Sequence, residues 1–275
     1  MQQTLANPVI ISGRALHTGK MVTMKVLPQE AYYGRRFIRT DLENQPEVRV
    51  FWENRLEVPL CTALAVGNDR ILTVEHFLAA CQGLGLDNLK IEIDGPEPPA
   101  LDGSALEFYK LLALGGIVKQ EAKPVIKLKE TITVKDGQAF IVAVPASELR
   151  LSYTFVSERM SIPDMFYDYL ENRDDFLTDL APARTIAFKE QLADMRQKGL
   201  ALGGDESMVV LIDNNGFANK RRFQNEVARH KLLDLYGDLS LIGEYRLLAH
   251  IIAVRTGHRH NALLAQKIVE QLVRD

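Results

Sequence analysis

The sequence of 275 residues is poor in cysteine and tryptophan and has almost no excess charge. Its two cysteines, Cys61 and Cys81, cannot form a disulfide framework or a cysteine-rich zinc site. The 33 basic and 36 acidic residues leave a net charge of −3, which argues against a nucleic-acid partner. No run approaches the roughly 18 apolar residues of a membrane span, and the N-terminus lacks the basic start and apolar core of a secretory signal. We therefore expect a cytoplasmic protein without a membrane span.

The hydrophobic share of 47% and the charged share of 25% are those of a globular chain with one or two domains. Apolar residues alternate at Val22, Met24 and Val26, which predicts a half-buried strand. Each half of the chain has strands, then a helix with a histidine, a further strand and a closing helix. The sequence therefore predicts an α+β fold with two domains of similar topology, 1–121 and 122–275, each a sheet with packed helices.

Several helix ends are also predicted. Thr73 is expected to cap a helix that follows it, and Ser104 with Glu107 is expected to form a capping box. The polar segment 157–180 is expected to be a surface excursion. The last helix is expected to span about 263–273.

The stretch from Glu226 to Asp238 contains the clearest candidate for chemistry. On a helix, His230 and Asp234 are four residues apart and share one face. An imidazole and a carboxylate in this arrangement can bind one zinc ion, although such a pair can also serve only to stabilise the helix. His76 is a candidate third ligand, and its neighbour Glu75 could accept a proton from water. The alternative is an acidic residue that favours the start of a helix.

Two glycine-containing segments carry further candidates. His258 follows Gly257 in an expected loop, where it could act as an acid or base or be a solvated surface residue. The segment Gly13–Lys20 could hold a phosphate through Arg14, Lys20 and backbone amides, or could simply connect two strands. It does not match a Walker A loop.

Seven motifs in order along the whole chain resemble those of the bacterial UDP-3-O-acyl-N-acetylglucosamine deacetylases, which carry out the committed step of lipid A biosynthesis. In sequence order they are Leu16-His17-Thr18-Gly19, Thr73-Val74-Glu75-His76, Asp94-Gly95-Pro96-Glu97 with Leu101-Asp102-Gly103-Ser104, Ala183-Arg184-Thr185, Leu202-Gly203-Gly204, Asn225-Glu226 with Arg229-His230-Lys231, Asp234 and Gly237-Asp238, and Gly257-His258 with Asn261.

The resemblance implies a role for each matching residue and an active site between the two domains. It implies that Zn²⁺ is held by His76, His230 and Asp234. It also implies four catalytic residues: Glu75 as general base, His258 as a cationic partner, Asp238 as the carboxylate that orients His258, and Thr185 as a hydroxyl that helps to hold the oxyanion.

The resemblance further implies where the substrate, a UDP-linked acylated amino sugar, binds. Lys231, His17 and Arg255 are expected to form a basic cradle for its diphosphate. The acyl chain is expected in a passage near 186–208, which includes Ile186, Phe188, Leu192 and Leu200, although this segment could instead only pack on its sheet. Two other functions stay open: a paralogous zinc amidase that acts on another acylated sugar, and a non-catalytic protein that binds sugar nucleotides. We expect a monomer.

Overall fold

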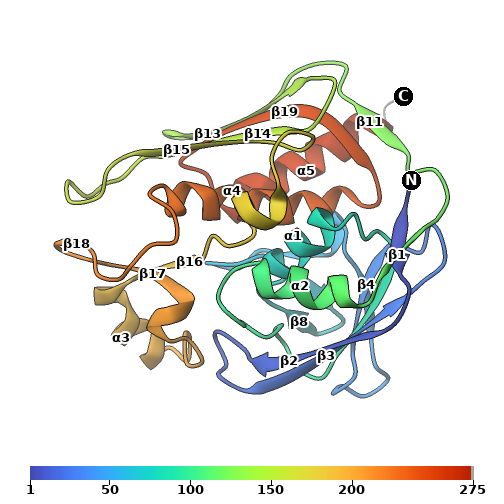
Figure 1. Ribbon diagram of the computed structural model, residues 1–275, viewed down its shortest axis with the longest axis horizontal. Coiled ribbons are helices and arrows are strands. Elements are labelled where there is room, and N and C mark those ends of the chain that lie inside the picture. The colour runs from blue at the N-terminus through green and yellow to red at the C-terminus, as the bar shows by residue number, and fades with distance from the viewer. Residues whose placement is uncertain (274–275) are drawn as a thin grey trace.

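Two mixed β-sheets enclose a layer of α-helices in the computed structural model, which describes residues 1–273 (Figure 1). This arrangement confirms the predicted α+β class. The helices of this layer are α1 (Glu75–Gly83), α2 (Leu106–Leu114), α4 (Glu226–Asp238) and α5 (His258–Val273), and α3 (Lys189–Gln197) lies outside it.

The two main sheets have the same strand order and the same pairing directions. In each sheet a central strand, β9 (Leu89–Ile93) or β19 (Arg246–Val254), is antiparallel to one neighbour and parallel to the other. The first sheet has the order β2 (Val9–Arg14), β3 (Met21–Pro28), β9 (Leu89–Ile93), β4 (Arg35–Arg39) and β5 (Glu47–Arg49). The second has the order β12 (Ile132–Asp136), β13 (Ala139–Pro145), β19 (Arg246–Val254), β14 (Arg150–Phe155) and β15 (Met165–Leu170), with β11 (Val125–Lys127) paired to β19.

Shorter strands complete the fold. One group is β6 (Arg55–Leu56), β7 (Ala63–Val66) and β8 (Asp69–Ile71), a second is β16 (Thr185–Phe188), β17 (Val209–Asp213) and β18 (Gly216–Phe217), and β1 (Gln3–Leu5) pairs with β10 (Ile117–Lys119).

One hydrophobic core joins the two halves. Its buried side chains include Phe77 of α1 and Phe108 of α2 from the first half, and Leu232 of α4 and Leu264 of α5 from the second. The predicted boundary after residue 121 falls between β10 and β11, and the division into two domains stays a prediction. In the described part of the chain, no helix has the length and apolar character needed to cross a membrane.

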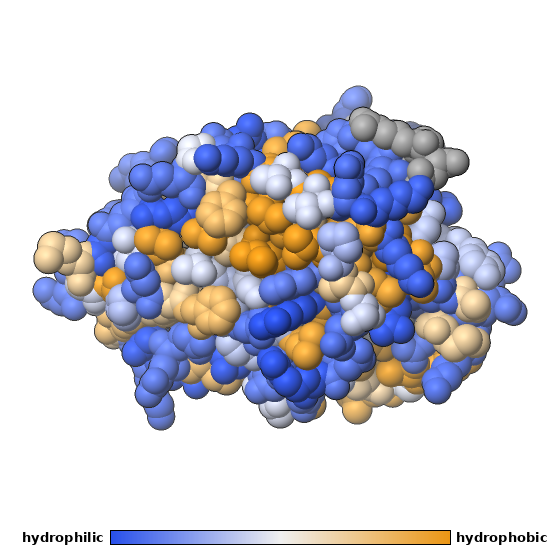
Figure 2. All heavy atoms as spheres, turned by 90° about the horizontal axis from the view of Figure 1, so that it is seen from above, coloured by the Kyte–Doolittle hydropathy of each residue, from blue (hydrophilic) through white to orange (hydrophobic). Residues whose placement is uncertain are grey.

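Along β3 and β19, every second side chain faces this core. In β3, Val22, Met24 and Val26 are buried while the intervening side chains are exposed, so the period-two prediction is confirmed. The outer faces of the sheets differ, because β3 presents Lys25 whereas β19 presents aliphatic residues such as Ile252. Figure 2 looks down on the second sheet and shows hydrophobic side chains gathered across the middle of that face.

The predicted cap at Thr73 is wrong, and the predicted capping box at Ser104 is only half formed. α1 begins at Glu75 after Val74, and the hydroxyl of Thr73 instead donates to the Glu97 carboxylate at 3.1 Å. α2 begins at Leu106, and its amide donates to Ser104. The carboxylate of Glu107 pairs with Lys110, so it does not complete a capping box.

Two further expectations change. Segment 157–180 contains β15 and a π-helical turn at Phe176–Leu180, both of whose end residues are buried, so it is not wholly a surface excursion. α5 begins at His258 rather than near residue 263. His258 therefore lies in the first turn of a helix and not in a loop.

Candidate active site

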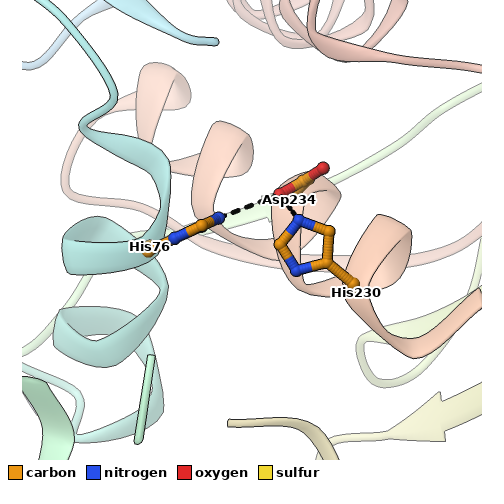
Figure 3. A group of neighbouring side chains, drawn as sticks. All are labelled: His76, His230 and Asp234. Atoms are coloured by element: carbon orange, nitrogen blue, oxygen red, sulfur yellow. Dashed lines mark ion pairs between the residues drawn. The ribbon is translucent and has the colours of Figure 1, made fainter. Parts of the chain in front are cut away.

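Helices α1 and α4 bring three metal-binding side chains together between the sheets. His76 projects from α1, and His230 and Asp234 project from one face of α4 toward it (Figure 3). Asp234 Oδ1 lies 3.5 Å from His76 Nε2 and 3.2 Å from His230 Nε2. The three ligand atoms lie within 4.8 Å of one another, and all three residues are buried. The prediction that His230 and Asp234 share one helical face is confirmed. The fold brings His76 of α1 next to them.

The hydrogen bonds of this group suit a divalent metal ion. His230 Nδ1 donates to the carbonyl oxygen of Ala183 at 3.1 Å, which leaves the lone pair of Nε2 facing the cluster. Burial lowers the pKa of His230 to about 3, so its imidazole is neutral, as a metal ligand must be. Asp234 Oδ1 is buried without a hydrogen-bond donor. A cation at this point would satisfy that oxygen and both imidazole nitrogens.

The pKa of His76 shifts in the opposite direction. Burial lowers it, but the contact with Asp234 and the charge of Glu75 outweigh burial and raise it overall. The pKa of Asp234 is well below its usual value, because the charges of Lys231 and His258 and the contact with His76 outweigh its burial. The aspartate is therefore ionised, and a bound metal would compete with a proton for His76.

Glu75 lies beside the metal ligands as the first residue of α1. Its side chain is buried, and Oε2 accepts a hydrogen bond from the amide of Thr62 at 3.0 Å. Burial raises the pKa of Glu75, although His258 and His76 oppose the shift. A carboxylate with a raised pKa is better suited to accept a proton near neutral pH.

His258 faces the same point from the first turn of α5. Its Nε2 lies 4.0 Å from Glu75 Oε1 and 3.8 Å from Asp234 Oδ2. Its Nδ1 lies 2.9 Å from Asp238 Oδ2, which also accepts from Asn261 at 2.9 Å. Burial lowers the pKa of His258, but Asp238, Glu75 and Asp234 outweigh it and raise the pKa to about 9. The imidazole is therefore cationic at neutral pH.

A cavity of about 1060 Å³ opens onto this group. Lys231, Thr185, His17 and Arg255, four of the predicted substrate or oxyanion residues, line it. Lys231 Nζ also binds Asp234 Oδ2 at 2.9 Å. Predicted site residues from both halves, with the exceptions of Asp238 and Leu200, thus line one cavity.

One wall of the cavity is apolar. Ile186 and Phe188 on β16 and Leu192 on α3 line it, as the acyl-passage prediction requires. Leu200 is not among the lining residues, whereas the adjacent Ala201 is. α3 also contacts β16 and β17, so the acyl passage and simple packing on the sheet both stay predictions.

The segment Gly13–Lys20 connects β2 and β3 rather than presenting free amides to a phosphate. The amides of His17 and Thr18 both donate to the Glu97 carboxylate. Arg14 donates to the carbonyl of Gly19. The connecting turn is thus the better description, although His17 itself still lines the cavity.

Sequence reasoning missed Thr62, which lies before β7 and is fully buried. Its hydroxyl donates to Asp238 Oδ1 and lies 3.2 Å from His258 Nδ1. No local pattern marks this threonine, because its partners are far away along the chain.

A buried His–His–Asp group, a neighbouring carboxylate and a cationic imidazole on an open cavity define the class of metal-dependent hydrolases. The chain belongs to the UDP-3-O-acyl N-acetylglycosamine deacetylase family, whose family model matches residues 2–270. It is 40% identical over 274 residues to the UDP-3-O-acyl-N-acetylglucosamine deacetylase of Thermosynechococcus vestitus, with 99% of this chain and 95% of the relative covered. Relatives with the same name occur in Nostoc sp., at 38% identity with 98% of each chain covered, and in Geobacter sp., at 36% with 98% of this chain and 89% of the relative covered. These matches confirm the resemblance.

Proposed function

We propose that this chain is a zinc-dependent deacetylase that hydrolyses the N-acetyl group of UDP-3-O-acyl-N-acetylglucosamine and releases acetate, as the committed step of lipid A biosynthesis. One observation carries the proposal. The buried ligand group of His76, His230 and Asp234 opens onto a cavity between Glu75 and His258. Two nitrogens and one carboxylate oxygen with an open fourth position are the ligand set of catalytic zinc.

When bound, zinc polarises the acetyl carbonyl and lowers the pKa of a coordinated water. Glu75 accepts a proton as the water oxygen bonds to the acetyl carbon. The carbon–nitrogen bond then breaks, the sugar nitrogen gains a proton, and the products are acetate and a free amine. Glu75 and His258 are the two proposed donors of that proton, and the 4.0 Å between Glu75 Oε1 and His258 Nε2 supports a role for both at one reacting centre.

The negative charge that develops on the acetyl oxygen needs nearby donors. His258 supplies a cation, since Asp238, Glu75 and Asp234 together raise its pKa to about 9. Thr185, the first residue of β16, supplies a hydroxyl on the cavity wall. These groups act on the reacting atoms and are expected to affect kcat.

The remaining cavity residues suit the other parts of the substrate. Lys231, His17 and Arg255 supply cationic or hydrogen-bonding groups for the diphosphate. Ile186, Phe188 and the α3 wall with Leu192 provide the apolar surface for the acyl chain. A site with one polar and one apolar wall favours an amphiphilic substrate. Leu200 stays a predicted contact without support from the cavity lining.

We also propose that the enzyme acts as a cytoplasmic monomer. The metal ligands, Glu75 and His258 all come from one chain. A second copy is therefore not needed to complete the site. Sedimentation velocity of the purified protein measures the oligomeric state directly.

The test is turnover of UDP-3-O-acyl-N-acetylglucosamine by zinc-loaded protein, followed as acetate release, with Glu75→Ala as the inactive control. Turnover that Glu75→Ala abolishes supports the deacetylase. Zinc binding with turnover of only a different acylated amino sugar would instead identify a paralogous amidase. Substrate binding without bound zinc or turnover would identify a sugar-nucleotide binding protein.

A further inference from the structure

We propose that Thr62 is a positioning residue of the deacetylase. It holds the carboxylate of Glu75 and the imidazole of His258 in a fixed position relative to each other. This inference rests on the proposed function. Thr62 comes from the first half of the chain, just before β7, and is fully buried. It contacts groups on α1, α4 and α5 without lining the cavity.

The backbone of Thr62 fixes the start of α1. Its amide donates to Glu75 Oε2 at 3.0 Å, and its carbonyl accepts from the amide of Val74 at 3.2 Å. With Oε2 held in this way, Glu75 Oε1 is the oxygen that faces His258. The carboxylate therefore cannot rotate freely between its two oxygens.

The hydroxyl of Thr62 fixes Asp238 on the other side. It donates to Oδ1, while Oδ2 accepts from His258 and Asn261. The same hydroxyl oxygen lies 3.2 Å from His258 Nδ1, so its lone pair is close to the histidine N–H. Because Asp238 is completely buried, each carboxylate oxygen needs a donor to stay in place.

The amide and the hydroxyl belong to one rigid residue, so the distance between their partners is set by covalent geometry. A β-branched side chain has few χ1 rotamers, and this adds to the restraint. Thr62 thus links Glu75 on α1 to the Asp238–His258 pair on α4 and α5. Its action on the reaction passes through these residues and not through the substrate.

The decisive variant is Thr62→Val, which keeps the shape and the amide but removes the hydroxyl. We expect kcat to fall about 10- to 100-fold with KM and zinc content unchanged, because the hydroxyl touches neither substrate nor metal ligand. Thr62→Ser should recover most of the loss. Thr4→Val is the matched control, since Thr4 is a buried threonine of β1 whose hydroxyl donates to the Asn88 carbonyl at 2.6 Å, and it should keep wild-type kcat.

A double-mutant cycle with Asp238→Asn makes the test independent of folding. If Thr62 acts through Asp238, Thr62→Val should cost far less in the Asp238→Asn background than in the wild type. Equal costs in both backgrounds, or wild-type kcat for Thr62→Val, would refute the inference. A rise in KM or a loss of zinc without a fall in kcat would do the same. Wild-type protein that fails to release acetate would reject the proposed function instead, so the two failures are distinct.

Discussion

Replacement of Gly237 by alanine should disrupt the junction on which the site depends. Gly237 is the residue of α4 before Asp238, and α4 passes the start of α1 at this point. A Cβ at Gly237 would lie 2.1 Å from the carbonyl oxygen of Glu75 and 2.9 Å from its carbonyl carbon. Ordinary van der Waals contact begins at 3.4 Å, so the two helices would have to separate by about 1.3 Å. The obstructing atoms belong to the backbone and cannot turn aside.

This separation should affect activity more than stability. Overpacking costs about 1–3 kcal/mol, whereas alanine in a helix gains about 1 kcal/mol over glycine, so the net loss of stability should be about 0–2 kcal/mol. A misplacement of about 1 Å at a catalytic group costs about 100-fold in rate. His76 moves with α1 while His230 and Asp234 move with α4, so zinc affinity should fall as well.

The assay combines urea unfolding, zinc titration and acetate release for Gly237→Ala. Gly83→Ala is the matched control, because a Cβ there would lie 2.2 Å from the Phe176 ring, at the other end of α1. It should destabilise the protein but leave zinc affinity and kcat near wild type. Unchanged zinc affinity and kcat in Gly237→Ala would show that the helix junction does not control the site.

Three further outcomes are expected. His230→Ala should lose most of the bound zinc, of which the wild type should hold about one equivalent per chain; full zinc content in the variant, measured by atomic emission, would reject the ligand assignment. The pKa of His258 is raised to about 9 from an ordinary 6.5, so its stabilising charge is fully present below 6.5 and is lost as pH rises through 9. Activity should therefore decline on the basic side, Asp238→Asn should move that decline to lower pH, and an unmoved pH–rate profile would contradict the reasoning. Leu192→Asp should impair long-chain substrates far more than a short-chain analogue, since each buried methylene contributes up to about 0.8 kcal/mol; equal impairment in parallel kcat/KM measurements would place the acyl chain elsewhere.

Periodicity predicted the parts of the fold that depend on local sequence. The alternation in β3 follows from the burial of one face of the strand, and the four-residue spacing of His230 and Asp234 follows from the helical turn. Neither pattern identifies His76 as a partner, because its contact with Asp234 exists only where α1 and α4 meet. The family motifs supplied that link.

The misplaced helix ends have local causes that sequence patterns do not reveal. Thr73 was expected to be a cap because threonine often is, yet its φ of 56° and its bond to Glu97 direct its side chain elsewhere. The first turn of α5 contains His258, Arg259, His260 and Asn261, so its apolar stripe begins only at Ala262. A search for apolar periodicity therefore starts this helix too late.

The charge of His258 depends on the contact between the two halves of the chain. Burial disfavours the imidazolium, and so does its position in the first turn of α5, where the helix dipole is positive. Asp234 and Asp238 come from α4, while Glu75 comes from α1 in the other half, and together they outweigh both effects. Although the two sheets have the same strand order, the carboxylates around His258 are therefore not supplied by one half of the chain alone. The carboxylates that keep this buried imidazole cationic come from both α1 and α4, and the junction of these helices brings them to one point.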